Sequence, residues 1–260
     1  MSSSVRGRVT SVDSTAAAEQ GRLRLDIGCG DGFYTELLAE RVGPGGRIVG
    51  MDVNAGFLDL AARRVPPQGA VSVEFKQVRL QDAPKVLSER FDIVWCAQCL
   101  YDFAEPVAAV RRMAQLVRPG GTVAVLENDT LHQLLLPWSM RLELALRVTE
   151  RATLEEESVQ PSKFYVGRRL PALLAEAGLE PLGFHTQTID RVAPFDPIVQ
   201  LFLKSYFAKL IDRVSGRLSP EDLAELREVA CPEGNRYLLR DPYCTFTWVN
   251  MLAWGRRPVD

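Results

Sequence analysis

Short apolar segments alternate with helical segments along the first half of the chain. Five segments have the apolar or alternating character of β-strands, namely residues 23–27, 47–51, 71–78, 91–96 and 122–126. Between the first three of them, apolar residues recur three and four positions apart, which is typical of helices that bury one face. Strands that alternate with helices through short loops form a parallel sheet with helices on both faces. The pattern therefore predicts a doubly wound α/β fold.

The second half of the chain is less regular. Residues 179–189 and 245–254 have strand patterns, and residues 131–151 and 167–177 have helical patterns, the first interrupted at Pro137. With the five strands of the first half, this predicts a mostly parallel, Rossmann-like sheet of seven strands.

Helical patterns also fill most of the segment between the last two predicted strands. Within it, Ser219 precedes Pro220 and two acidic residues, which is typical of a helix start. We expect a flexible segment at 1–21, one α/β domain formed by 22–190 and 243–260, and a helical insertion at 191–242. The insertion is expected to cover the active edge of the sheet as a substrate lid.

Composition narrows the class of protein. The 260 residues include 31 basic and 33 acidic ones, and this balance argues against a nucleic-acid-binding protein. No apolar run reaches the roughly 20 residues of a membrane-spanning helix, and residues 1–20 lack the apolar core of a secretory signal. The five cysteines are an odd number at irregular spacing, as expected of reduced thiols. We therefore expect a cytoplasmic protein without a membrane span, and a homodimer is compatible with the sequence.

The sharpest local signal is the glycine-rich loop Gly28–Gly32 after the first predicted strand. A strand that turns sharply into a helix needs glycine where the backbone takes unusual angles and where a ligand approaches the main chain. Asp52, 22 residues after Gly30, ends the next predicted strand, where a carboxylate can accept both hydroxyls of a ribose. Together these features predict a ligand that contains adenosine, beyond the carboxyl ends of the strands.

The residues around the loop indicate which adenosine ligand it is. A dinucleotide fingerprint has glycine at the position of Phe33, where the helix start must stay bare for pyrophosphate. Asp26 and Asp31 would repel phosphates and suit a cation. A ligand that combines adenosine, a sulfonium and an ammonium fits these charges better than a dinucleotide.

At this point the chain resembles the class I S-adenosylmethionine-dependent methyltransferases, of the small-molecule type found in ubiquinone and menaquinone biosynthesis. The resemblance runs through residues 22–128 and more loosely through 163–189 and 245–254. It implies that Asp26 and the backbone of Gly28, Cys29 and Gly30 hold the amino-acid end of the cofactor. It further implies that Asp52 binds the ribose, that Val53 packs on the adenine, and that the Cys96 carbonyl accepts the ammonium.

One position departs from the pattern of that family. Its members commonly carry Gly-Asp-Ala after the third strand, where the Asp contacts the adenine amino group, and here Arg79 stands at that position. Because Arg79 cannot accept this hydrogen bond, the adenine must use the Leu80 backbone, Gln81 or Asp82.

The candidates for acceptor chemistry follow the fourth and fifth predicted strands. Tyr101 and Asp102 stand where small-molecule members of the family carry substrate-facing residues, and a packed loop is the simpler alternative. His132 follows the fifth strand, and histidine is the usual side chain that removes a proton near neutral pH. A substrate contact or a helix start is the alternative for His132. Cys96 and Cys99 have CxxC spacing without a second pair, so we expect no metal site.

The sequence favours a methyltransferase that acts on oxygen, nitrogen or carbon of a small, partly apolar molecule. The main alternative is a protein that keeps the fold and binds the cofactor or a partner without catalysis, since a fold does not determine a function. A nicotinamide-dependent oxidoreductase is a third reading, which Phe33 disfavours.

Overall fold

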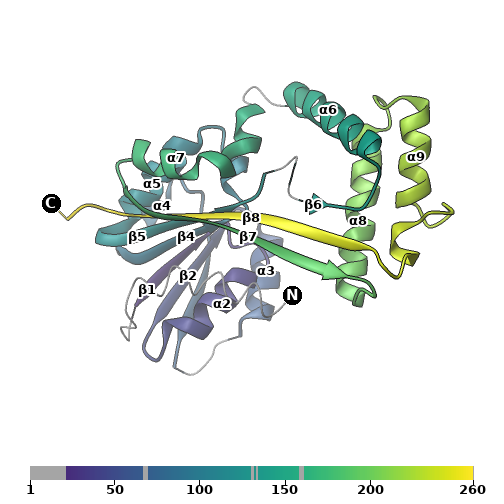
Figure 1. The fold of residues 1–260 in the computed structure, drawn as a ribbon. Helices are drawn as coiled ribbons and strands as arrows, with labels where there is room; N and C mark the ends of the chain where they lie inside the picture. Colours follow the sequence, from purple (N-terminus) through teal and green to yellow (C-terminus); the bar gives the residue numbers. More distant parts are fainter. Residues whose placement is uncertain (1–21, 67–69, 130–131, 133, 158–160, 260) are drawn as a thin grey trace. The chain divides into compact units, whose positions relative to one another are not determined.

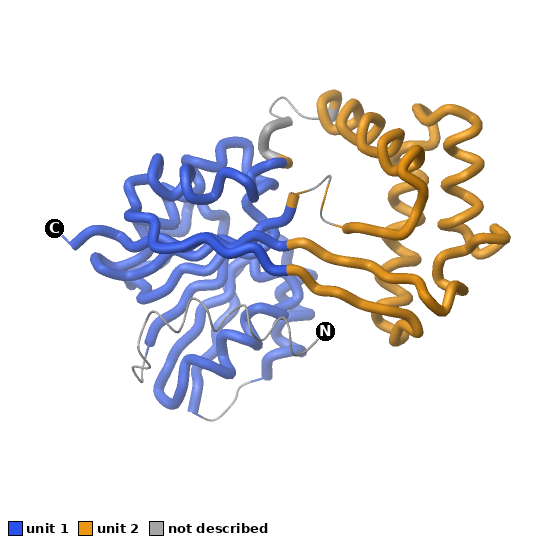
Figure 2. The backbone as a smooth tube through the Cα atoms, viewed as in Figure 1, with its two compact units in different colours: residues 1–128, 165–187, 250–260 blue, residues 129–164, 188–249 orange. Residues whose placement is uncertain are grey.

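The computed structural model describes residues 22–66, 70–129, 132, 134–157 and 161–259. The chain divides into two compact units (Figure 2). The first comprises residues 1–128, 165–187 and 250–260, and the second comprises residues 129–164 and 188–249.

The first unit contains the predicted parallel sheet (Figure 1). Its parallel strands are β1 (Leu23–Ile27), β2 (Arg47–Asp52), β3 (Ser72–Gln77), β4 (Phe91–Ala97) and β5 (Val117–Glu127). They lie in the order β3-β2-β1-β4-β5, and β8 (Thr245–Arg256) then pairs antiparallel with β5. Strand β7 (Glu180–Val192) pairs with β8, so the seven predicted strands are confirmed. The structure adds the two-residue strand β6 (Leu134–Leu135), which pairs with β8 in the second unit.

Helices cover both faces of this sheet. They are α2 (Phe33–Val42), α3 (Ala55–Arg64), α4 (Ala83–Val86), α5 (Pro106–Leu116) and α7 (Leu170–Glu176). Val94 of β4 shares an apolar cluster with Met113 of α5 and Leu173 of α7. The next residue, Trp95, points to the opposite face because side chains alternate along a strand, and there its ring contacts Tyr34 of α2. The strand order places the carboxyl ends of β1, β2, β4 and β5 at one edge, where ligands bind in open α/β sheets.

The second unit has its own helical core. It is formed by α6 (Met140–Glu157), α8 (Pro197–Val214) and α9 (Pro220–Ala230), together with β6 and parts of β7 and β8. The predicted start of α9 is confirmed, because the Ser219 hydroxyl accepts the backbone N–H of Asp222. Buried side chains such as Leu146 of α6, Leu203 of α8 and Leu226 of α9 share one apolar cluster.

The sequence pattern differs from the structure in two places within this second unit. The helix predicted at 131–151 starts only at Met140, beyond Pro137, and β6 precedes it. The unit is also larger than the predicted insertion at 191–242, because α6 packs on α8 and α9. Long-range packing of this kind leaves no mark in local periodicity.

Within the described ranges, no helix is both long and apolar enough to cross a bilayer.

Candidate functional site

The glycine loop adopts a backbone conformation that depends on its glycines. Gly28, Gly30 and Gly32 have φ angles of 64°, 52° and 82°, a region that other residues rarely enter. A Cβ atom on Gly28 would also lie 2.4 Å from the Cys99 sulfur, so this position needs glycine for two reasons. The Gly30 N–H donates to the Asp52 carboxylate at 3.0 Å, which ties the loop to the end of β2.

Asp26 is fully buried beneath this loop. Its side chain accepts the Thr35 hydroxyl at 2.6 Å and forms no ion pair with another described residue. Burial raises the pKa of Asp26 to about 7, the Thr35 hydrogen bond lowers it, and the nearby Asp52 raises it further. The site therefore holds a carboxyl group that a bound cation would ionise. Sequence reasoning missed Thr35, although a polar residue among the apolar positions of α2 was a signal for it.

Asp52 is oriented by two backbone amides. One carboxylate oxygen accepts the Gly30 N–H and the other accepts the Asn54 N–H at 2.9 Å. Asn54 in turn caps α3 by accepting the N–H groups of Gly56 and Phe57, as its position before the helix predicts. The carboxylate of Asp52 is thereby held at the carboxyl end of β2, where the sequence predicts the ribose site.

A pocket of about 510 Å³ is lined by Val53, the residue that follows Asp52. Its described lining consists of Val53, Gln77, Val78, Arg79, Asp82 and Val86. Val53 is 61% exposed, and its apolar side chain at a pocket wall fits the predicted contact with an adenine ring. Of the three alternatives for the adenine amino group, neither Leu80, whose side chain is buried, nor Gln81, which is exposed, belongs to this lining. Asp82 is the alternative that lines the pocket.

The segment after β4, which we call the β4 loop (residues 98–102), packs directly on the glycine loop. Its Cys99 sulfur fills the space in front of Gly28, and Leu100 is fully buried. Tyr101 and Asp102 belong to the short 3-10 helix η1 (Leu100–Asp102). Burial raises the pKa of Tyr101 to about 12, with Asp102 adding to the effect, so the phenol stays protonated at neutral pH.

The three cysteines of this region, Cys29, Cys96 and Cys99, behave as packing residues. Burial and nearby carboxylates raise the pKa of Cys29 strongly, and its side chain is buried. Cys96 is buried at the end of β4, and its hydrogen bond with Cys99, together with burial, raises its pKa. A thiol that resists ionisation is a poor nucleophile and a poor metal ligand. In the described residues, no group of three or more His, Cys, Asp or Glu side chains could hold a metal ion.

Glu127, the last residue of β5, is another buried carboxyl group at this edge. One of its oxygens accepts the Cys99 N–H at 2.9 Å and the Leu100 N–H. Burial raises the pKa of Glu127 to about 8, and the hydrogen bonds from these amides lower it. An acidic residue at the end of an otherwise apolar strand was the signal in the sequence.

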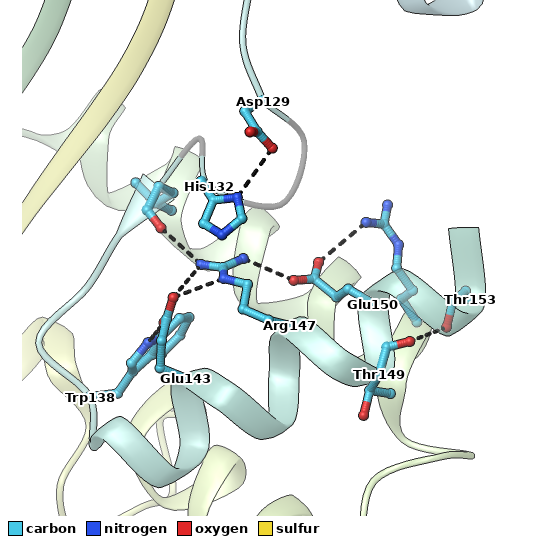
Figure 3. Close-up of polar contacts among 10 residues, drawn as sticks. Asp129, His132, Trp138, Glu143, Arg147, Thr149, Glu150 and Thr153 are labelled. Atoms are coloured by element: carbon cyan, nitrogen blue, oxygen red, sulfur yellow. Dashed lines mark hydrogen bonds and ion pairs between the residues drawn. The ribbon is translucent and has the colours of Figure 1, made fainter. Parts of the chain in front are cut away.

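His132 lies in the second unit, beside Asp129. Figure 3 shows its ring turned toward that carboxylate, with 3.3 Å between His132 Nδ1 and Asp129 Oδ1. The Asp129 side chain is 1% exposed and that of His132 is 48% exposed. A buried carboxylate at Nδ1 favours the tautomer that carries its proton there, so Nε2 becomes the proton acceptor. Asp129 is a residue that the sequence analysis did not single out.

The chain is similar to known methyltransferases. A family model described as "Methyltransferase domain" matches residues 25–125. The chain is 30% identical over 196 residues to a ubiquinone biosynthesis O-methyltransferase of Bordetella avium (strain 197N), and the match covers 75% of each chain. It is also 30% identical over 175 residues to a protein of that name from Pseudomonas aeruginosa (strain UCBPP-PA14), which covers 66% of this chain and 70% of that one.

Solved structures share the fold at lower identity. The YcgJ protein from Bacillus subtilis has a TM-score of 0.58 and 15% identity, over 97% of this chain and 98% of that one. The [4+2]-cyclase SpnF has a TM-score of 0.52 and 17% identity, over 98% of this chain and 82% of that one. The glycine loop, the carboxylate at the end of β2 and the similarity to these relatives agree. The chain therefore belongs to the class I S-adenosylmethionine-dependent methyltransferases.

Proposed function

We propose that this methyltransferase acts on a phenolic hydroxyl of a small, partly apolar molecule. The observation that carries the proposal is the similarity to O-methyltransferases over three quarters of both chains. A phenol also suits the proton acceptors that the chain offers, because it ionises near pH 10, far below an aliphatic alcohol.

The cofactor fits the residues at the carboxyl edge of the sheet. In this proposal Asp52 accepts the ribose hydroxyls, Val53 packs on the adenine, and Asp82 accepts its amino group. Asp26, the Gly28–Gly30 backbone and the Cys96 carbonyl hold the amino-acid end. When bound, S-adenosylmethionine supplies a methyl group that its positive sulfur already activates. The protein's main task is then to align the acceptor oxygen with that methyl group, which can lower the barrier by several kcal/mol.

Charge supports this cofactor over a phosphate-bearing one. Asp26 and Asp52 are carboxyl groups at this edge, and neither forms an ion pair with another described residue. A sulfonium and an ammonium would be attracted to such an edge, whereas a pyrophosphate would be repelled. Phe33 also occupies the start of α2, where a dinucleotide needs a bare backbone.

Proton removal is assigned to the residues after β5 and β4. His132, oriented by Asp129, takes the proton from the acceptor hydroxyl at Nε2. Asp129 is two residues after Glu127, the end of β5. Tyr101, which stays protonated, donates a hydrogen bond to the acceptor, and Asp102 is the second candidate base.

Methyl transfer tests the proposal directly. Protein is incubated with S-adenosylmethionine labelled in its methyl group and with phenols, catechols, aliphatic alcohols and amines as probe acceptors. We expect label in the phenols or catechols, and a His132→Ala variant that is slower by about 100-fold at saturating acceptor, the contribution of a general base. His185→Ala, which removes a histidine of β7, is the matched control. Label in amines alone would contradict the proposal, and normal turnover of His132→Ala would exclude the role of that residue.

One observation bears on the alternative, in which the protein binds the cofactor or a partner without transferring a methyl group. The [4+2]-cyclase SpnF shares this fold, so the fold alone does not fix the reaction. S-adenosylmethionine binding without label transfer to any probe acceptor or metabolite extract would favour it. The cytoplasmic location, the homodimer and the lid role of residues 191–242 stay predictions.

A further inference from the structure

The β4 loop is held by groups from neighbouring strands. The Gln98 N–H donates to the Leu126 carbonyl at 2.8 Å, which extends the ladder between β4 and β5 by one residue. Gln98 has a φ of 52°, the one positive value among the described residues other than glycine. Its side-chain amide donates to Asn250 Oδ1 of β8 at 3.3 Å. A strained residue fixed on both sides indicates a loop whose conformation is specified by its surroundings.

The strongest of these contacts come from Glu127. Its Oε1 accepts the N–H groups of Cys99 and Leu100, which open the 3-10 helix η1. Cys99, at the N-cap position of η1, provides no side-chain cap of its own. A carboxylate 28 residues away in sequence therefore caps this short helix. Oε1 can accept both amides in either protonation state, because a protonated carboxyl group keeps its carbonyl oxygen as an acceptor.

Stability alone is a poor reason for a carboxyl group at this position. Glu127 is fully buried, and its second oxygen, Oε2, has no hydrogen-bond partner in the described part of the chain. Burying a carboxyl group without a cation is unfavourable, and an apolar residue at a strand end usually stabilises a sheet at least as well. Such an unfavourable group is most readily explained by what it orders, which here is the β4 loop.

That loop connects the two halves of the proposed site. Cys96, whose carbonyl is assigned to the cofactor ammonium, precedes it, while Tyr101 and Asp102 at its end are assigned to the acceptor. Its Cys99 side chain also rests on Gly28 of the glycine loop. A change in the course of the loop would therefore disturb both ligands at once.

We propose that Glu127 is a positioning residue, which orders the β4 loop for cofactor and acceptor by accepting its amides through one carboxyl oxygen. The part of this inference that concerns ligands rests on the proposed function. Glu127 acts through the loop and contacts neither ligand in this account. A glutamine can take its place, since a carboxamide oxygen at the position of Oε1 accepts the same two amides.

Asp92 offers a matched control at the start of β4, the end of that strand away from the β4 loop. Its carboxylate accepts the Leu23 N–H at 2.7 Å and the Arg118 side chain at 2.7 Å, at the start of β4. Asp92→Ala thus removes a carboxylate that binds a backbone amide in this sheet, far along β4 from the proposed site. It measures the effect of lost stability without a lost loop cap.

The experiment compares Glu127→Ala, Glu127→Gln and Asp92→Ala with the wild-type protein. Hydrogen exchange reports the protection of the Cys99 and Leu100 amides, and calorimetry reports the affinity for S-adenosylhomocysteine. In Glu127→Ala we expect protection and affinity to fall by roughly 10- to 100-fold, the effect of leaving two backbone amides without their acceptor. Glu127→Gln should keep the protection and stay within about threefold in affinity, and Asp92→Ala should keep both.

Two results would overturn the inference. One is wild-type protection and affinity in a folded Glu127→Ala protein. The other is an equal loss of affinity in Glu127→Ala and Asp92→Ala, which would mean that general stability explains the effect. Failure of the wild-type protein to bind S-adenosylhomocysteine would instead refute the proposed function. The exchange of the two amides in Glu127→Gln and Glu127→Ala would then still decide whether Glu127 orders the loop.

Discussion

Buried carboxyl groups occur in both compact units, but they meet different neighbours. In the second unit, Glu150 of α6 lies 3.1 Å from Arg147 (Figure 3) and 3.5 Å from Arg213. Arg147 also binds Glu143 at 2.8 Å. In the first unit, Asp26 and Glu127 bind hydroxyl and amide groups only, as far as the described residues go.

The presence or absence of a neighbouring arginine distinguishes the structural network around Glu150 from the proposed ligand site around Asp26. Burial raises the pKa of Glu150, and Arg147 and Arg213 act against that rise. The charge of Glu150 is therefore balanced inside the protein. For Asp26 the neighbouring charge is Asp52, which raises its pKa further. Negative charge that the fold leaves unbalanced at the carboxyl edge of a parallel sheet is available to a cationic ligand.

Breaking the balanced network should have the largest effect. Arg147→Met leaves Glu143 and Glu150 without their main cation, so we expect the free energy of unfolding to fall by about 3 kcal/mol. Denaturation in urea measures it. Arg151→Met, on the same helix with a 3.6 Å pair to Glu155 at the surface, is the control and should change stability by less than about 0.5 kcal/mol. Equal stability of the two variants would show that the network around Arg147 is not structural.

Changing the ribose carboxylate should affect binding and spare stability. Asp52→Asn removes a charged acceptor at the end of β2, so the dissociation constant for S-adenosylmethionine should rise by roughly 10- to 100-fold. Calorimetry measures this, with Asp59→Asn on the exposed face of α3 as the control. An unchanged dissociation constant in Asp52→Asn would remove this residue from the site.

The unbalanced carboxyl groups predict a pH dependence of binding. A cation favours the ionised form of Asp26, whose pKa in the free protein is about 7, so binding below that pH must release its proton. Affinity for S-adenosylmethionine should therefore rise about tenfold from pH 6 to pH 8 and then level off. Asp26→Asn should flatten the profile, and a flat wild-type profile would contradict the raised pKa.

The stability of the free protein should change with pH in the opposite direction. Burial raises the pKa of Asp26 and of Glu127 above the ordinary values of these groups, so their protonated forms favour the folded state. Their contribution is complete at low pH and is lost as pH rises through about 7 and about 8. Urea titrations of Asp26→Asn and Glu127→Gln should show a shallower fall than the wild-type protein between about pH 4 and pH 8, from the ordinary pKa values of these groups to their raised ones.

The smallest effect is expected at the adenine pocket. Asp82→Asn should weaken S-adenosylmethionine binding about threefold, because one acceptor in an open pocket contributes a modest hydrogen bond. Gln81→Ala, one position away and outside the pocket lining, should bind as tightly as the wild-type protein. Weaker binding by Gln81→Ala together with unchanged binding by Asp82→Asn would instead assign the adenine contact to Gln81.

Local signals in the sequence were enough to predict the main strands and helices of the first unit. The alternation of strands and helices, the glycine loop and Asp52 are encoded within short stretches, where periodicity and turn chemistry decide the structure. The same is true of the Ser219 cap, which depends on residues three positions apart.

Contacts between distant segments could not be predicted. Residues 129–164 and 188–249 form one compact unit because α6 packs against α8 and α9. No local sequence pattern encodes this packing. Glu127 reaches the β4 loop across 28 positions, and Asp82 is singled out by the shape of a pocket. The contact between Asp129 and His132 could not be predicted either. The two residues are three positions apart, but this spacing alone does not show that the Asp129 carboxylate faces the His132 ring.

The most direct test of the account titrates the wild-type protein with S-adenosylmethionine at pH 7 in two buffers of different ionisation heat. The account predicts saturable binding of one ligand per chain, accompanied by the release of about half a proton, since Asp26 is half ionised at its pKa of about 7. NADH should give no saturable heat. Saturable binding of NADH, together with no heat from S-adenosylmethionine, would contradict it.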